Sequence, residues 1–79
     1  MDFKEAISNR ILELCKKYNY SPNKLSEMSG IAPSTLRDTI SGLVDNPSAT
    51  VIFKICKTLD IEIKDFYDSN LFSKDNLDY

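Results

Sequence analysis

The chain has 79 residues and a mass of 9.0 kDa, which suits one small domain. Ten basic and twelve acidic side chains give a net charge of −2 and a pI near 4.9, which argues against a polybasic tail for membranes or nucleic acids. The sequence has no histidine and two cysteines, so the usual general base is absent and the thiols are too few for a zinc site or a disulfide framework. We therefore expect no enzyme activity, no metal and no cofactor.

The charge is unevenly distributed along the chain. Residues 1–59 carry eight basic and six acidic side chains, a net charge of +2, whereas residues 60–79 carry two lysines and six carboxylates, a net charge of −4. No apolar run approaches the ~20 residues that cross a bilayer, and the first residues lack the cationic and apolar regions of a signal peptide. We expect a cytoplasmic protein with no membrane partner.

The first predicted helix spans about residues 3–18, where apolar residues recur at helical spacing and indicate an amphipathic helix. Its apolar positions are Ile7, Ile11, Leu14, Cys15 and Tyr18. Ser21-Pro22 then predicts a helix start, because the serine hydroxyl can accept a backbone N–H and proline at the first helical position loses no hydrogen bond. Gly30 ends this helix of about eight residues, since glycine readily adopts the left-handed conformation found after helices.

Two further helices follow the same logic. Ala32-Pro33 starts a helix of about nine residues that Gly42 ends, and this helix is expected to bury Leu36 and one of Thr39 and Ile40. Ser48 can cap the next helix. The apolar stripe of that fourth helix consists of Ile52, Ile55, Cys56 and Leu59.

A short fifth helix is predicted from Ile63 to about Ser69. No segment alternates long enough to predict a strand, so the fold class is all-α, and five short helices with short connections favour a compact domain over a four-helix bundle. We expect this domain to span residues 1–72. Residues 73–79 are polar and predicted to form a disordered tail.

The second and third predicted helices meet across Ser29-Gly30-Ile31, and two short helices joined by a tight glycine-containing turn form a helix-turn-helix unit. The run from Leu25 to Asp38, LSEMSGIAPSTLRD, resembles the Cro/C1-type (XRE) helix-turn-helix family. Further matches to the family are Ser41-Gly42, Asn46-Pro47-Ser48, Lys54-Ile55-Cys56 and Leu59-Asp60-Ile61. The resemblance covers residues 6–69 and implies a lambda-repressor-like, five-helix DNA-binding domain with its helix-turn-helix at about residues 21–42.

The resemblance also implies which residues contact DNA. In the family, the positions matching Pro33, Ser34 and Asp38 read bases, and the helix start at residues 21–23 lies against the phosphate backbone. The residues fit these roles chemically, because Arg37 could pair with guanine and serine or threonine could bond either partner. Each candidate could instead be an ordinary solvated side chain. The candidates are Ser21, Asn23, Lys24, Ser34, Thr35, Arg37, Asp38 and Ser41.

The sequence departs from the family in two ways. The loop after the third helix holds Leu43, Val44 and Asp45, where family members often have lysine or arginine. Asp38 places a negative charge on the recognition face, which is acceptable only opposite a cytosine amino group, so a plain surface charge is the simpler interpretation. With Lys24 and Arg37 as the clear cations, one protomer would neutralise two or three phosphates, and binding is expected to be modest and to need a dimer.

These features predict a transcriptional regulator, in the first instance a repressor, that binds operator DNA as a homodimer through its third helix. The alternative is a protein-interaction module with the same fold and weak or lost DNA binding. Two sets of apolar residues are candidate dimer surfaces. The first set is Phe66, Tyr67, Leu71 and Phe72, and the second is Leu43, Val44 and Phe53. The first set could instead close the core, and Phe53 could instead complete the edge of the core. Cys15 and Cys56 are expected to be buried free thiols.

Overall fold

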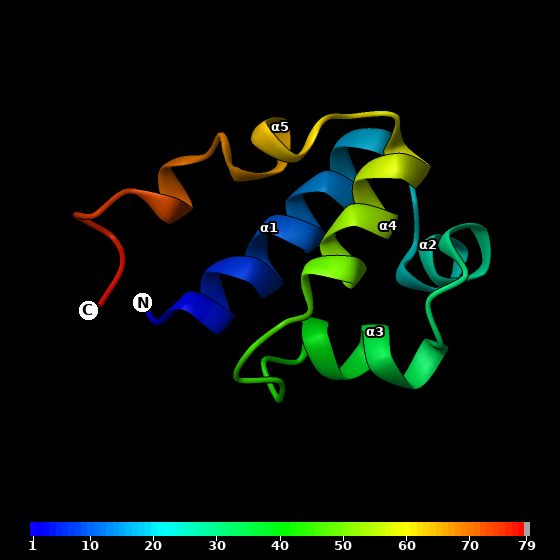
Figure 1. Cartoon of the computed structure of the whole chain (residues 1–79), viewed down its shortest axis with the longest axis horizontal. Coiled ribbons are helices and arrows are strands. Elements are labelled where there is room, and N and C mark those ends of the chain that lie inside the picture. Colours follow the sequence, from blue (N-terminus) through cyan, green and yellow to red (C-terminus); the bar gives the residue numbers. More distant parts are fainter. Residues whose placement is uncertain (79) are drawn as a thin grey trace.

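Six helical segments follow one another in the computed structural model, which describes residues 1–78 (Figure 1). They are α1 (Phe3–Tyr18), α2 (Pro22–Ser29), α3 (Pro33–Ile40), α4 (Ala49–Leu59), α5 (Ile63–Tyr67) and a 3₁₀ helix, η1 (Asn70–Phe72). The described part of the chain has no strand and no helix long and apolar enough to cross a membrane. The predicted all-α class with five α-helices is confirmed.

The helix ends lie where the polar and glycine residues predicted them. Ser21 accepts a hydrogen bond from the Lys24 N–H at 3.0 Å, and Ser48 accepts one from the Thr50 N–H at 3.1 Å. Each serine thus satisfies a backbone donor that has no partner within the helix. Gly30 ends α2 with a φ of +74°, a conformation that side chains with a Cβ rarely adopt. The predicted cap and stop of α2 and the predicted cap of α4 are confirmed.

The fifth helix ends two residues earlier than its sequence predicts. It stops at Tyr67, and Asp68 leaves the helical region with φ −81° and ψ +76°. The Arg10 guanidinium binds the carbonyl oxygens of Asp65 and Phe66, at 2.8 and 2.7 Å. The guanidinium donates to carbonyls that would otherwise accept from the N–H groups of a further helical turn. The helix therefore ends here, and the chain changes direction before it forms η1.

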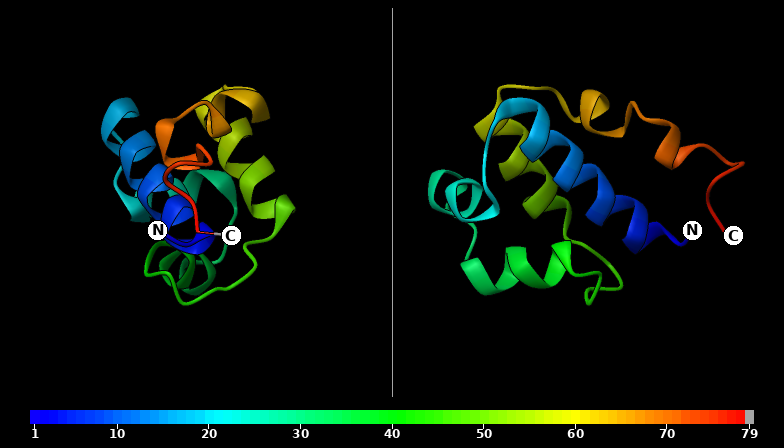
Figure 2. Two further views of the ribbon diagram at one scale, coloured as in Figure 1. Left: turned by 90° about the vertical axis from the view of Figure 1, so that its left-hand side faces the viewer. Right: turned by 180° about the vertical axis from the view of Figure 1, so that it is seen from behind.

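The core lies between α1 and the helices around it. Helix α1 contacts α2, α3 and η1, while α2 packs on both α3 and α4, and α5 packs on α4 (Figures 1 and 2). In α3, Leu36 and Thr39 are buried and Ile40 is partly buried. The other buried core residues match the predicted stripes, and both cysteines are among them: Ile7, Ile11, Leu14, Cys15, Leu25, Ile31, Ile52, Ile55, Cys56, Leu59 and Phe66.

Aromatic rings near the end of the chain close this core over α1. Phe66 is fully buried, and the Phe72 ring packs 6.1 Å from it and 6.2 Å from the ring of Phe3. Tyr67 adds an edge contact to Phe72 at 5.0 Å. Of the two roles that the sequence left open for this group, Phe66 has the core role, because a side chain without exposed surface offers nothing to a partner.

Residues 73–78 turn back beside the start of α1. The Asp78 N–H donates to the Met1 carbonyl at 2.9 Å, and the Asn76 side-chain amide donates to the Asn70 carbonyl at 2.6 Å. The predicted tail includes Tyr79, which lies outside the described residues. The domain boundary at residue 72 and the disorder of the tail stay predictions.

Candidate nucleic-acid interface

The turn between α2 and α3 is fixed by hydrogen bonds as well as by glycine. The buried Ser26 hydroxyl on α2 donates to the Ile31 carbonyl at 2.6 Å, and the Ile31 N–H donates to the Ser29 hydroxyl at 3.2 Å. Ile31 itself is buried in the core. Because both backbone groups of Ile31 are bonded inside the unit, the angle between α2 and α3 is set before any ligand binds.

Helix α3 presents an outward ridge of short polar side chains. Ser34, Asp38 and Ser41 follow one another at spacings of four and three residues, so they share one side of the helix axis. The opposite side buries Leu36 and Thr39. The Ser8 hydroxyl on α1 donates to the Ile40 carbonyl and thereby anchors the end of α3 to the core. The ridge therefore lies on a helix that packs against the core, and it faces away from the core.

A groove separates this helix from the start of α2. It has a volume of about 240 Å³ and brings residues predicted to contact bases and backbone into one place. Its lining consists of Pro22, Asn23, Ser26, Pro33, Leu36, Arg37, Ile40 and Ser41. Asn23 and Arg37, which are 14 positions apart in the sequence, thus face a common groove. Of the five remaining candidates, Ser21, Lys24, Ser34 and Thr35 are exposed and Asp38 is partly exposed.

Arg37 is the most available cation of α3. Its side chain is 71% exposed and its only ion pair is with the neighbouring Asp38, Nε to Oδ1 at 4.0 Å, within residues 1–78. At that distance and exposure the pair is weak. The guanidinium is therefore free to bind another partner.

A second cation, the Lys4 ammonium, is already paired within the fold, which the sequence pattern did not reveal. The Lys4 ammonium on α1 lies 3.0 Å from the Asp45 carboxylate in the loop after α3. The hydrogen bond to Asp45 and its charge raise the pKa of Lys4. The two residues are 41 positions apart, so no local pattern could have paired them. Asp45, which departs from the family pattern, thus lies against a lysine and its charge is balanced.

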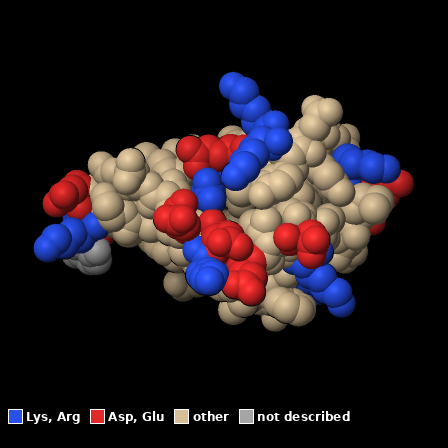
Figure 3. Space-filling view, turned by 90° about the horizontal axis from the view of Figure 1, so that it is seen from above, with Lys and Arg blue, Asp and Glu red and all other residues tan. Residues whose placement is uncertain are grey.

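The acidic residues gather away from α3. Helix α5 lies on the opposite side of the molecule, and Figure 3 views that side, where carboxylates cluster in the middle of the surface among scattered cations. The segment from Asp60 to Asp68 contributes four exposed carboxylates, those of Asp60, Glu62, Asp65 and Asp68. These four carboxylates therefore lie opposite the polar ridge (Figure 1) and repel an anion there little.

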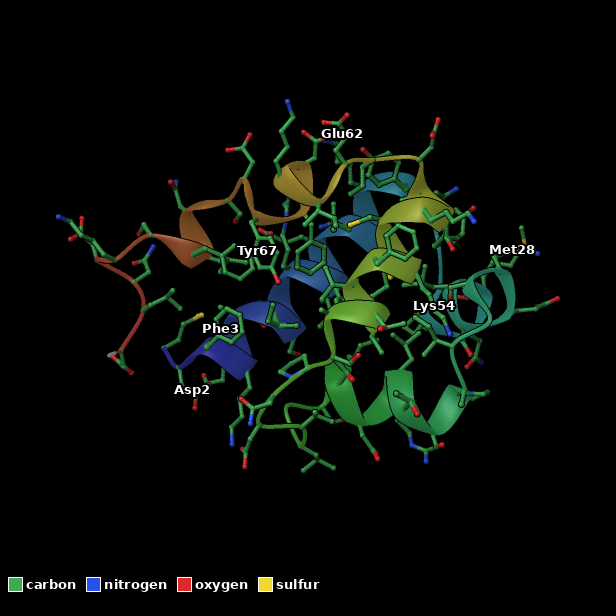
Figure 4. The ribbon with its side chains drawn as sticks, viewed as in Figure 1. Asp2, Phe3, Met28, Lys54, Glu62 and Tyr67 are labelled. Carbon is green, nitrogen blue, oxygen red and sulfur yellow. The ribbon has the colours of Figure 1, made fainter. Side chains whose placement is uncertain are left out.

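A second feature is an apolar surface on the outer side of α4. Phe53 is 51% exposed, with Met28 of α2 at 55% and Ile63 of α5 at 50%. Two shallow grooves meet at Phe53. The first also contains Met28 and Lys54, the second contains Ile63 and Glu62, and both contain Lys57. Figure 4 labels Met28, Lys54 and Glu62. We call Met28, Phe53 and Ile63 the α4 surface. The sequence grouped Phe53 with Leu43 and Val44, but neither lines these grooves.

Comparison with known proteins agrees with this architecture. The family described as the Cro/C1-type HTH DNA-binding domain matches residues 10–70. A solved structure described as "Crystal structure of the prophage Lp1 protein 11" superposes with a TM-score of 0.83 at 29% sequence identity, covering 94% of this chain and 99% of that one. No curated protein matches the chain. The family match over residues 10–70 agrees with the fixed turn and the polar outward ridge of the helix-turn-helix. The chain therefore belongs to the Cro/C1-type HTH DNA-binding domain family, a family of DNA-binding domains rather than enzymes.

Proposed function

We propose that this chain is a sequence-specific transcriptional regulator, and specifically a repressor, that inserts α3 into the major groove of operator DNA. The observation that carries the proposal is the outward ridge of α3 beside the groove at the start of α2. The ridge can reach base edges, while the N-terminal turn of α2 can bind phosphate through its backbone N–H groups. The candidate contacts are Ser21, Asn23, Lys24, Ser34, Thr35, Arg37, Asp38 and Ser41.

Two considerations favour repression over activation. A small DNA-binding domain that covers an operator blocks transcription by occupancy alone. The similar solved structure is of a prophage protein, which supports a role in the gene control of a mobile element. Such a regulator acts in the cytoplasm, where the DNA is accessible.

The binding experiment is a titration of the chain into duplexes selected from a random library, repeated at several salt concentrations. Binding should weaken as salt rises, because each neutralised phosphate releases counterions. Arg37→Ala should cost about 1–3 kcal/mol if Arg37 contacts a base. Lys16→Ala is the matched control, since it removes one exposed cation from the end of α1 and should change affinity little. Equal losses in the two variants would remove α3 from the interface.

We further propose that the regulator is a homodimer joined through the α4 surface. Few cations are available on one protomer, so two recognition helices are needed for useful affinity. The α4 surface has three half-exposed apolar side chains, whereas in the other candidate set Phe66 is buried and Tyr67 is the exposed member. The two grooves beside Phe53 also contain three lysines and one carboxylate, those of Lys54, Lys57, Lys64 and Glu62, of which Glu62 and Lys64 pair with each other at 3.5 Å.

The geometry required of this dimer is specific. A stable interface buries about 800 Å² per partner, about one sixth of the 5114 Å² surface of this chain. Two-fold symmetry predicts an operator that is an imperfect palindrome, with half-sites about 34 Å apart.

Analytical ultracentrifugation tests the dimer directly. Phe53→Glu should convert dimers to monomers and weaken operator binding, because it places a charge in the apolar contact. Leu12→Glu is the control, since Leu12 is a similarly exposed apolar residue, on α1. A wild-type monomer at every concentration, with no selected DNA, would favour the alternative function, in which the α4 surface binds a different protein and DNA affinity has been lost.

A further inference from the structure

The aspartates of this chain differ in whether their carboxylates have a structural partner. The Asp2 carboxylate caps α1 by accepting from the Glu5 N–H, and that of Asp65 caps α5 by accepting from the Glu62 N–H, each at 3.0 Å. The carboxylate of Asp45 binds Lys4. These three carboxylates stabilise the fold, so they need no ligand to account for their positions.

Asp38 has no such partner within residues 1–78. Its side chain is 48% exposed, no hydrogen bond to its carboxylate is found, and its one ion pair is the 4.0 Å contact with Arg37. The carboxylates of Asp60, Asp68 and Asp75 also have no partner within the described residues, so the feature that sets Asp38 apart is its place on α3. Its place in the centre of the outward ridge, between Ser34 and Ser41, would direct it at the floor of a groove that receives α3.

The chemistry of the major groove narrows what this carboxylate can bind. A carboxylate only accepts hydrogen bonds, and the groove offers donors only at the amino groups of cytosine and adenine. Adenine presents its N7 acceptor beside the amino group, which repels a carboxylate. The cytosine base itself presents no second acceptor in the groove, and the acceptor next to its amino group, O6, belongs to the paired guanine. Guanine and thymine present acceptors, and thymine also a methyl group.

Arg37, the next residue along α3, has the complementary preference. Its guanidinium donates in a planar fork that matches the O6 and N7 acceptors of guanine. A C·G base pair presents the cytosine donor and the guanine acceptors together in one groove. Adjacent acidic and basic side chains about 4 Å apart therefore match one such pair, or two successive ones.

We propose that Asp38 selects cytosine, through its amino group, at one position of each operator half-site, with Arg37 on guanine of the same or the adjacent base pair. The proposal rests on the function proposed above, since it takes α3 to be the recognition helix. It assigns the negative charge of the ridge a role in specificity. The carboxylate weakens binding to every sequence by repelling phosphates, and it weakens binding least where a cytosine amino group is opposite.

The test is selection of binding sites from a random duplex library with the full chain and with Asp38→Asn. The wild-type chain should enrich sites with a cytosine at one position of each half-site. Asp38→Asn should change that position to adenine, because an asparagine amide pairs with the N6 and N7 groups of adenine. Its preference for adenine over cytosine there should be roughly 10- to 100-fold, with other positions unchanged.

Asp45→Asn is the matched control, since it makes the same chemical change in a carboxylate held by Lys4 beside the ridge. It should select the wild-type sequence. Asp38→Ala, a second variant, should lose the cytosine preference without gaining one for adenine. All variants are checked by circular dichroism for intact helices.

The outcomes separate the two proposals. If the wild-type chain enriches a sequence that Asp38→Asn enriches unchanged, the cytosine proposal is overturned while the regulator proposal stands. The same holds for a selected sequence without a C·G pair. If neither the wild-type chain nor any variant enriches a sequence, the regulator proposal itself fails, and the cytosine proposal fails with it.

Discussion

The two arginines of this chain predict opposite results when each is replaced by methionine. The side chain of Arg10 is 14% exposed, and that of Arg37 is 71% exposed. Arg10 joins α1 to the end of α5 through two short hydrogen bonds, to the Phe66 and Asp65 carbonyls at 2.7 and 2.8 Å, and a long one to the Asp68 carbonyl at 3.5 Å. Methionine retains most of the apolar stem of either arginine and removes the charge and all donors.

Each hydrogen bond from a charged group contributes about 1.5–3 kcal/mol. The carbonyls lie at a helix end where water can partly replace the guanidinium, so the lower value applies, and Arg10→Met should lower the free energy of unfolding by about 3 kcal/mol. The 3.2 Å contact of Arg10 with the half-exposed Glu13 adds little. For a domain of this size, such a loss lowers the Tm by roughly 12–24 °C.

Urea denaturation followed by circular dichroism measures the loss, and hydrogen exchange of the α5 amides locates it. Arg10→Lys should lie between the wild type and Arg10→Met, because an ammonium keeps the charge but not the planar fork. Arg37→Met should change stability by less than about 0.5 kcal/mol and instead weaken DNA binding. If Arg10→Met cost less than about 1 kcal/mol, or if Arg37→Met cost as much, the division of roles between the two arginines would be refuted.

Three further predictions concern the turn and the core. Ser26→Ala should cost about 1–3 kcal/mol in urea denaturation, because the buried Ile31 carbonyl loses its donor; a neutral result would show that water replaces the hydroxyl. Gly30→Ala should cost about 1–2 kcal/mol from the backbone alone, since φ is +74° and a Cβ would meet no atom within 4 Å. Gly30→Asn should cost less, and equal costs would point to a clash rather than to backbone conformation. Burial raises the pKa values of the Cys15 and Cys56 thiols above 9.0, so above that pH the unfolded chain releases protons that the folded chain keeps. Stability should therefore be retained below about pH 9 and fall as the pH rises through the folded-state values; replacing both cysteines with alanine should flatten this slope, and a flat wild-type slope would contradict it.

Local signals in the sequence determined the helices and the turn. Ser21-Pro22, Gly30, Ala32-Pro33 and Ser48 each act through their own backbone or the next turn of helix, and they ended or started helices as predicted. Apolar spacing likewise predicted the buried stripes, because a side chain's position around a helix depends only on its place in the chain. The run LSEMSGIAPSTLRD also identified the family from the sequence itself.

Contacts between distant residues were not readable in this way. Lys4 meets Asp45 across 41 positions, and Arg10 meets Phe66 across 56. No local pattern encodes such pairs, since they depend on how α1 packs against the loop after α3 and against the end of α5. The premature end of α5 at Tyr67 has the same origin, because the side chain that binds its last carbonyls comes from α1.

The sequence by itself determined the helices and the turn, because caps, glycines and apolar spacing act within a few residues. Its resemblance to the Cro/C1-type HTH family identified the DNA-binding domain. It also showed that the chain is mildly acidic, with a net charge of −2. Only the tertiary structure decided where that charge lies and what each charged group does. Asp45 is balanced by Lys4, and the carboxylates of residues 60–68 lie across the molecule from α3 (Figures 1 and 3). Arg10 binds within the fold, whereas Asp38 and Arg37 remain available on the outward side of α3. Electrostatic interactions depend on distance in space, which only the packing of the helices fixes.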